Sequence, residues 1–294
     1  MAELSVIIVN RNAGEQLADC LASVEREAGG KDWEVLALDN ASSDGSLEAA
    51  SKRFPAVKLV RNSENVGFAK ANNQGLRMSS GRFVLFLNPD TVVFPGALGR
   101  LLEELRREPG TGAVAPALLC GKDNFQVSFG EEVTFFRELA RKSILNAWRR
   151  RRLRRLKGKR RTAWVSGACL MTSREVLENV GGFDEKFFLY FEDIDLCYRI
   201  RRRGFSVVFL PEAVVFHAGG VSASGAAYPS RLEYRKSQVY FYKKHNPASS
   251  QKLLKLYLRL SARLAGLFGS QSDEAKAFRR ELLEVLKEKE AGRR

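Results

Sequence analysis

Short apolar segments alternate with longer amphipathic ones along the first part of the chain. The apolar segments predict strands at 4–9, 34–38, 57–60, 83–87 and 113–118. Between them, apolar residues recur at helical spacing and predict helices around 14–28, 44–53 and 66–79. This alternation predicts an α/β fold whose mostly parallel sheet is flanked by helices on both faces.

Residues 119–161 interrupt this alternation, and order resumes at 163. We expect a strand over 164–171, a short helix over 173–180, a helix from 192 to 203, and two strands at 205–210 and 213–216. From about residue 249, an apolar stripe at helical spacing predicts an amphipathic helix, followed by a charged helix over 271–294. The domain organisation expected is therefore a main domain over 1–246 and a helical tail over 247–294.

Positive charge is concentrated in one segment. The 294 residues carry a formal charge of +15, of which residues 137–161 supply +12 and the rest of the chain only +3. This basic insert can be a solvated loop, or it can bind an anionic membrane surface or a polyanionic acceptor. Nucleic acid is the less favoured partner, because no zinc-finger or RNP motif accompanies the charge. The tail segment 251–268 is also basic and amphipathic, and suits either an anionic bilayer or packing on its own domain.

The four cysteines are scattered among apolar neighbours with no CxxC pair, so we expect reduced core thiols rather than a zinc site or a disulfide framework. The N-terminus does not have the pattern of a signal peptide, and no apolar run is long enough to span a membrane. The expected location is the cytoplasm, with peripheral attachment to the inner face of the cytoplasmic membrane.

Acidic residues follow the predicted strands. Asp39 comes after the strand 34–38, and Asp90 comes after the strand 83–87. Ligands of open α/β sheets bind at such strand ends. A carboxylate there can hold a divalent cation on phosphate oxygens, or accept a hydrogen bond from a base or a sugar. A second carboxylate near the first could act as a general base, and the cluster around Asp193 offers one. His217 ends a predicted strand further along the chain.

The segment 65–75 places Gly67, Ala71 and Gly75 four residues apart on one helical face. Small residues allow close backbone approach. Asn72 and Asn73 are weak helix formers, so helix propensity does not explain them. Tight packing of this helix on the sheet and a helix start facing a nucleotide are both open.

Several blocks together resemble the inverting glycosyltransferases of family 2, which have the nucleotide-sugar-binding GT-A fold. The blocks are 5–12, 38–46, 65–69 with Asn72, Asn73 and Gly75, 87–90, 182–184, 192–196 and His217. The resemblance covers residues 3–246 apart from the basic insert. The chain is most similar to the rhamnosyltransferase-like branch that builds bacterial cell-surface polysaccharides.

The resemblance implies roles for individual residues. Asp193 would be the general base, and Glu192 and Asp195 would orient the acceptor and the base. Asp90 and His217 would bind Mg²⁺ or Mn²⁺. The donor would be a dTDP- or UDP-sugar, held by Val9, Asn12, Asp39, Asn40, Asn65, Gly67, Phe68, Asn72, Asn88 and Asp90. The acceptor would be a glycan or lipid-linked sugar near Gly167 and Glu192.

Two positions depart from the family pattern. Asn88 replaces the first acid of the common Asp-x-Asp metal motif, and Arg11 stands where the family often has Tyr.

Two alternative functions also stay open. A sugar nucleotidyltransferase would need a glycine-rich basic loop after the first strand, which 10–14 matches poorly. A noncatalytic nucleotide-sugar-binding module would be expected to lack the acids that are present here.

Overall fold

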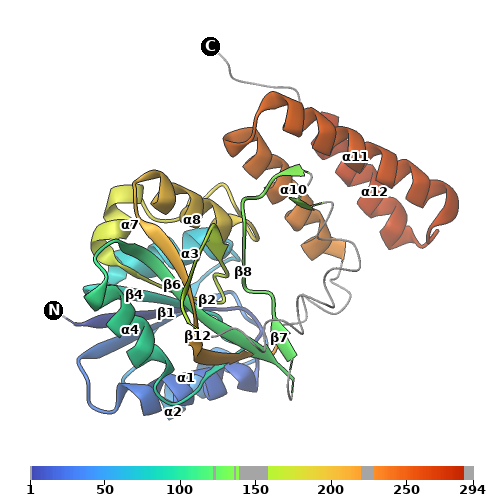
Figure 1. Cartoon of the computed structure of the whole chain (residues 1–294). Coiled ribbons are helices and arrows are strands. Elements are labelled where there is room, and N and C mark those ends of the chain that lie inside the picture. Colours follow the sequence, from blue (N-terminus) through green and yellow to red (C-terminus); the bar gives the residue numbers. More distant parts are fainter. Residues whose placement is uncertain (1, 122–123, 136, 139–157, 220–227, 288–294) are drawn as a thin grey trace.

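The computed structural model describes residues 2–121, 124–135, 137–138, 158–219 and 228–287 (Figure 1). Most of the basic insert 137–161 therefore lies outside the described residues, as does the end of the tail, 288–294. The described chain forms a sheet domain, with three long C-terminal helices packed at one side (Figure 1).

In the described chain, the strands are β1 Leu4–Asn10, β2 Trp33–Asn40, β3 Lys58–Asn62, β4 Phe83–Leu87, β5 Thr91–Val93, β6 Thr111–Cys120, β7 Asn124–Gln126, β8 Phe129–Gly130, β9 Arg160–Thr162, β10 Trp164–Val165, β11 Cys169–Ser173 and β12 Ser206–His217. The central sheet has the order β3-β2-β1-β4-β11-β6-β12-β5, with β7 beside β6 and β9 beside β12. β8 and β10 form a separate pair. Strands β3, β2, β1 and β4 are parallel, and β6 is parallel to β12. β11 runs antiparallel between β4 and β6. The predicted mostly parallel sheet is confirmed.

Helices cover both faces of the sheet. They are α1 Glu15–Ala28, α2 Ser46–Arg53, α3 Phe68–Met78, α4 Ala97–Arg107, α7 Arg174–Val180 and α8 Glu192–Arg202, followed by α10 Tyr228–His245, α11 Ala248–Phe268 and α12 Asp273–Lys287. Successive side chains of β1 enter different cores. Val6 and Ile8 pack with α1, α2 and α4, while Ile7 packs in the cluster that includes α3, α7 and α8. Burial on both faces explains why β1 is a continuous apolar run.

The structure corrects several predicted elements. The two strands predicted at 205–210 and 213–216 are one strand, β12, with an irregular register between Leu210 and Val214. The segment 164–171 is divided between β10 and β11. Helices α4 and α10 were not predicted, although α4 carried a clear signal: Leu98, Leu101, Leu102 and Leu105 are all buried at helical spacing.

The C-terminal helices share a core with the sheet domain. Leu232 of α10, Leu258 of α11 and Leu282 of α12 are each at most 4% exposed and belong to the same cluster as Leu196 of α8. Within the described ranges, no helix is long and apolar enough to cross a membrane. Cys20, Cys169 and Cys197 are free thiols in the core, and Cys120 is partly exposed.

Candidate active site

The ends of β1 and β2 meet at Asp39. The Asn10 amide donates to Asp39 Oδ1 at 2.7 Å, and the backbone N–H of Ser42 donates to Asp39 Oδ2 at 3.0 Å. The Asp39 side chain is fully buried. Each of its oxygens therefore has one protein donor and keeps acceptor capacity for a ligand. Asn10 was not predicted as a site residue, yet it fixes this carboxylate.

The loops after these two strands are also fixed by side-chain amides. Asn12 has a positive φ of 50°, and its Oδ1 accepts from the N–H of Ser43 at 2.9 Å. The Asn40 amide donates to the carbonyl of Gly67 at 3.2 Å and accepts from Asn62 at 2.8 Å. Val9 lies at the end of β1 and is only 7% exposed. Asn40 thus ties the β2 edge to the start of α3.

The start of α3 packs against the loop before α8. Gly67 has φ 87°, and a Cβ there would lie 2.8 Å from the carbonyl oxygen of Phe188. This positive φ and close approach explain the glycine. The N–H of Phe68 donates to that same oxygen at 2.8 Å, and Asn65 Oδ1 accepts from the N–H of Gly67 at 3.1 Å. Phe188 was not predicted, because its contact depends on a loop more than a hundred residues away.

Asn72 has the clearest unmet hydrogen-bonding capacity on α3. It is 1% exposed, and its amide nitrogen donates to the carbonyl of Phe68 at 2.9 Å. Its Oδ1 is buried with no hydrogen-bond partner in the described part of the chain. A buried orphan acceptor is costly unless a ligand satisfies it, which favours the nucleotide-facing interpretation of this helix.

A second group lies where β4 ends and β12 ends. His217 pairs with Thr91 in the register of β12 and β5, which brings the imidazole Nε2 to 3.3 Å from Asp90 Oδ1. The amide of Asn88 lies 3.3 Å from the same Nε2. His217 Nδ1 lies 2.7 Å from Gln126 Oε1. Since that oxygen can only accept, Nδ1 donates to Gln126, and Nε2 is the ring nitrogen that faces Asp90.

The side chains of Asp90 and His217 fit a divalent cation whose remaining ligands come from the substrate. Among the described residues, no group of three or more His, Cys, Asp or Glu side chains could hold a metal. Mg²⁺ commonly takes only one or two protein carboxylates and completes its shell with phosphate oxygens and water. One carboxylate, and one imidazole whose other nitrogen is held by Gln126, suit such a site. Gln126 was not predicted, because β7 gave no sequence signal.

Asp193 sits in the first turn of α8 and faces the backbone before β11. Its Oδ2 accepts from the N–H of Gly167 at 2.8 Å, and its Oδ1 accepts from the N–H of Ile194 at 2.8 Å. A Cβ at Gly167 would lie 3.2 Å from the Asp193 Cβ and 3.7 Å from the ring of Phe68. Gly167 therefore lies between Phe68, which is expected to bind the donor, and Asp193, the expected base.

Burial raises the pKa of both acids at this helix start. Burial and the neighbouring Asp193 carboxylate raise the pKa of Glu192 well above its ordinary value of 4.5. Burial also raises the pKa of Asp193 above 3.8, although hydrogen bonds from the N–H groups of Gly167 and Ile194 oppose the rise. Glu192 is 6% exposed, and its Oε2 has no partner in the described structure. A raised carboxyl pKa suits a general base working near neutral pH.

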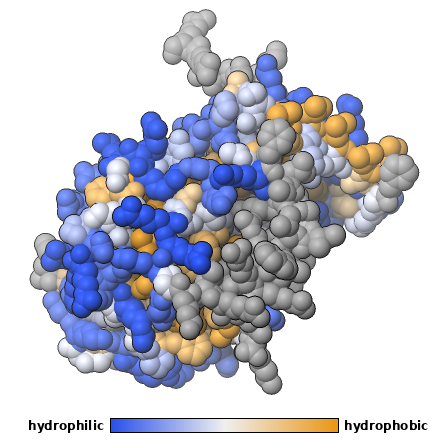
Figure 2. All heavy atoms as spheres, in the orientation of Figure 1, coloured by the Kyte–Doolittle hydropathy of each residue, from blue (hydrophilic) through white to orange (hydrophobic). Residues whose placement is uncertain are grey.

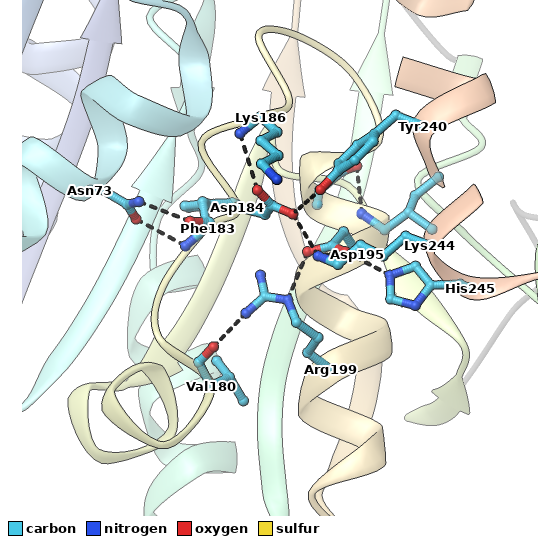
Figure 3. A network of polar contacts seen from close by, with 12 residues as sticks. Asn73, Val180, Phe183, Asp184, Lys186, Asp195, Arg199, Tyr240, Lys244 and His245 are labelled. Atoms are coloured by element: carbon cyan, nitrogen blue, oxygen red, sulfur yellow. Dashed lines mark hydrogen bonds and ion pairs between the residues drawn. The ribbon is translucent and has the colours of Figure 1, made fainter. Parts of the chain in front are cut away.

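Asp195, two residues after Asp193, contacts side chains of α10 (Figure 3). Its carboxylate accepts from Arg199 Nε at 2.7 Å, from Lys244 Nζ at 2.6 Å, and bonds His245 Nε2 at 2.7 Å. Burial raises the pKa of Asp195, but His245, Arg199 and Lys244 more than offset that effect and lower the pKa below 3.8. The carboxylate is fully buried and joins α8 to α10. It is directed toward α10, and not toward the Asp193 carboxylate.

The two acidic groups of the site are joined through neighbouring strands. The N–H of Asn88 donates to the carbonyl of Ala168 at 2.9 Å, and the N–H of the preceding residue, Gly167, donates to Asp193. Backbone hydrogen bonds at Ala168 and Gly167 thus link Asn88, whose amide contacts His217, to the expected base Asp193, and Phe68 packs near Gly167. The structure separates Asp195 from this group.

Comparison with known proteins identifies the family of this chain. The model of glycosyl transferase family 2 matches residues 5–181. The chain belongs to this family. Membership of this family shows that the chain is a glycosyltransferase. It favours glycosyl transfer over the two alternatives, a sugar nucleotidyltransferase and a noncatalytic binding module.

The family's relatives include a rhamnosyltransferase. The chain is 30% identical over 259 residues to an N-acetylglucosaminyl-diphospho-decaprenol L-rhamnosyltransferase of Mycobacterium tuberculosis, covering 81% of this chain and 83% of that protein. It is 27% identical to a low-salt glycan biosynthesis hexosyltransferase of Haloferax volcanii, over 70% of this chain and 64% of the relative.

A solved structure supports the fold. A mannosyltransferase from Pyrobaculum calidifontis, in complex with GDP-Man and Mn²⁺, matches with a TM-score of 0.59 and 21% identity. The match covers 97% of this chain and 81% of that one. The GT-A fold implied by the sequence resemblance is confirmed.

Proposed function

We propose that this glycosyltransferase transfers a sugar from a nucleotide-diphosphate donor to a lipid-linked acceptor sugar, with inversion at the anomeric carbon. Rhamnose is the sugar that we favour. The observation that carries the proposal is the position of Gly167, which touches Asp193 on one side and lies against Phe68 on the other. The similarity to a rhamnosyltransferase with a lipid-diphosphate substrate supports the choice of sugar and acceptor.

In this proposal, the nucleotide lies along the carboxyl ends of β1 and β2. Asp39 accepts a hydrogen bond from the base, within a frame fixed by Asn10 and Asn40. The orphan oxygen of Asn72 accepts from a donor hydroxyl. A divalent cation held by Asp90 and His217 would offset negative charge on the leaving diphosphate.

Asp193 removes the proton from the acceptor hydroxyl as that oxygen bonds to the anomeric carbon. The bond from that carbon to the diphosphate breaks, and the nucleoside diphosphate leaves on the opposite face. One displacement needs one base, so no second carboxylate is required as a covalent nucleophile. Glu192, buried and with a raised pKa, supports the base from the same turn. Asp195 serves to position α8 against α10.

The Asp193→Asn variant tests this mechanism. Donor binding should be nearly unchanged, and turnover should fall by at least roughly 100-fold, because general base catalysis contributes about that much. Asp273→Asn, at the exposed start of α12, is the matched control and should keep full turnover. Loss of donor affinity with preserved turnover would refute the assignment. Calorimetric titration with UDP, dTDP and GDP, each with and without Mn²⁺, identifies the donor base.

We also propose that α11 holds the enzyme at an anionic membrane surface. The helix exposes Leu253, Leu256, Leu260, Leu264 and Leu267, which are 38–73% accessible. Figure 2 shows hydrophobic atoms gathered along this side of the molecule. Lys252, Arg259 and Arg263 follow one edge of the stripe, and no acid occurs between 247 and 272. An exposed apolar stripe with flanking cations is typical of helices that lie in a membrane interface.

Vesicle sedimentation tests this attachment. The wild-type protein should sediment with vesicles containing phosphatidylglycerol and much less with pure phosphatidylcholine. Leu256→Ser with Leu260→Ser should abolish the difference. Equal binding of that variant to the anionic vesicles would refute the role of the stripe.

A further inference from the structure

A cavity of about 490 Å³ lies among the three C-terminal helices, away from the strand ends. One wall is apolar and comes from α11 and α12, with Leu258, Ala262, Phe278 and Leu282. The volume falls in the range of small-molecule sites. The proposed donor and base residues do not line it, so the mechanism above leaves it unexplained.

Three arginines line the same cavity: Arg231, Arg235 and Arg279. The guanidinium of Arg231 lies 4.8 Å from the centre of the Phe278 ring. Arg235 donates to Gln238 Oε1 at 2.7 Å, and Arg279 donates to the carbonyl of Ser270 at 2.8 Å. In the described ranges, no ion pair joins any of the three to a carboxylate. Among the described residues, their side chains contact neutral partners, and none of the three charges is paired with a carboxylate.

Guanidinium groups match phosphate oxygens in bidentate geometry, and each has five N–H donors. Three guanidinium groups that line one cavity, together with its apolar wall, suit a ligand with an anionic phosphate head and an apolar chain. Neither a free nucleotide nor a bare glycan has both parts.

The cavity reaches toward the proposed base. Tyr190 lines the cavity and precedes Asp193 by three residues, so their Cα atoms are at most about 11 Å apart. Tyr190 and Phe191 both have positive φ, at 69° and 67°, which is uncommon for aromatic residues. The rings of both lie against Tyr234 of α10, with centroids 5.7 and 5.2 Å away. Tyr190, the first residue of this strained pair, thus forms the cavity edge two residues before the helix that carries Asp193.

We infer that this cavity binds the diphosphate head and the first part of the hydrocarbon chain of the lipid-linked acceptor. The inference rests on the proposed function, which needs such an acceptor, and it assigns the acceptor's lipid end to the C-terminal helices. The arginines hold the diphosphate, and the attached sugar lies toward Tyr190 and Asp193. The chain leaves along α11, whose opposite side carries the exposed leucines.

Farnesyl diphosphate is the probe, titrated by calorimetry with EDTA present and with excess dTDP to fill the donor site. We expect it to bind. Pyrophosphate should bind at least roughly tenfold more weakly because it has no hydrocarbon chain to bury against the apolar wall. Farnesol should bind at least roughly tenfold more weakly because it lacks the charged hydrogen bonds to the arginines. The double variant Arg231→Gln, Arg235→Gln should lose at least tenfold in affinity by the same reasoning. Arg280→Gln, exposed on α12 and outside the cavity, is the matched control and should bind as wild type.

A second variant guards against a folding defect. Ala265 lines the cavity but is exposed, so Ala265→Phe should fold and fill the space. It should block farnesyl diphosphate with an unchanged melting temperature. Unchanged binding in both variants would overturn the inference. Pyrophosphate binding as tight as that of farnesyl diphosphate would overturn the lipid assignment and indicate a free phosphate site. If Asp193→Asn keeps full turnover while the probe still binds at the arginines, the proposed mechanism fails and the cavity assignment stands.

Discussion

Asp195→Asn tests whether this acid supports the fold or takes part in the chemistry. The carboxylate is fully buried and contacts Arg199, Lys244 and His245 within 2.7 Å (Figure 3). Removing one partner of a buried ion pair typically costs 3–5 kcal/mol. Lys244 keeps Asp184 at 2.7 Å, and Arg199 keeps the carbonyl of Val180 at 2.6 Å. The loss should therefore lie at the low end, about 3 kcal/mol.

Equilibrium urea unfolding at pH 7 measures this loss. For a domain of this size, about 3 kcal/mol corresponds to a melting temperature roughly 6–12 °C lower. The exposed pair of Glu48 and Arg61 is the matched control, and Glu48→Gln should leave the free energy of unfolding nearly unchanged. Lys244→Met combined with Asp195→Asn should destabilise by less than the sum of the two single changes, because they share one interaction.

The pH dependence has a definite sign. Since the pKa of Asp195 is lowered in the folded state, its contribution is present above the ordinary value of 3.8 and is lost as pH falls through the folded pKa. The destabilisation by Asp195→Asn should thus shrink as pH falls below 3.8. An unchanged unfolding free energy with a loss of turnover of roughly 100-fold would refute this reasoning, because it would make Asp195 a participant in the chemistry.

Three further predictions concern the site itself. Gly167→Ala places a Cβ 3.2 Å from the Cβ of Asp193, so steady-state kinetics should show a lower kcat with an unchanged melting temperature; an unchanged kcat would contradict the close packing. Because burial raises the pKa of Asp193 above 3.8, kcat/KM should fall as pH decreases through a value above that of an ordinary aspartate, and a profile flat down to pH 4 would exclude it as the base. Asp90→Asn should remove the enhancement of nucleoside diphosphate binding by Mn²⁺ in calorimetry, whereas Gln126→Ala, which releases the His217 ring, should weaken it only in part.

The strand ends could be predicted from sequence because two simple rules apply to them. Apolar runs fix where β1, β2 and β4 lie, and ligands of parallel sheets gather at their carboxyl ends. Asp39 and Asp90 follow directly from these rules. Asn10, Gln126 and Phe188 do not, because each acts through a partner at least 29 residues away, at distances set only by the folded chain. The leucines of α4, by contrast, carried a local signal that the helical period alone would have found.

The acids of α8 show where sequence reasoning stops. Asp193 and Asp195 are two residues apart, and successive residues in a helix turn by about 100°, so the two side chains must point in nearly opposite directions. The resemblance could place both near the reaction, but it could not say which direction faced the strands. That choice depends on α10, whose Lys244 and His245 lie 49 and 50 residues further along the chain. Once α10 holds Asp195, Asp193 is turned toward Gly167. The helix that lines the proposed acceptor cavity on one side thus fixes the direction of the proposed base on the other.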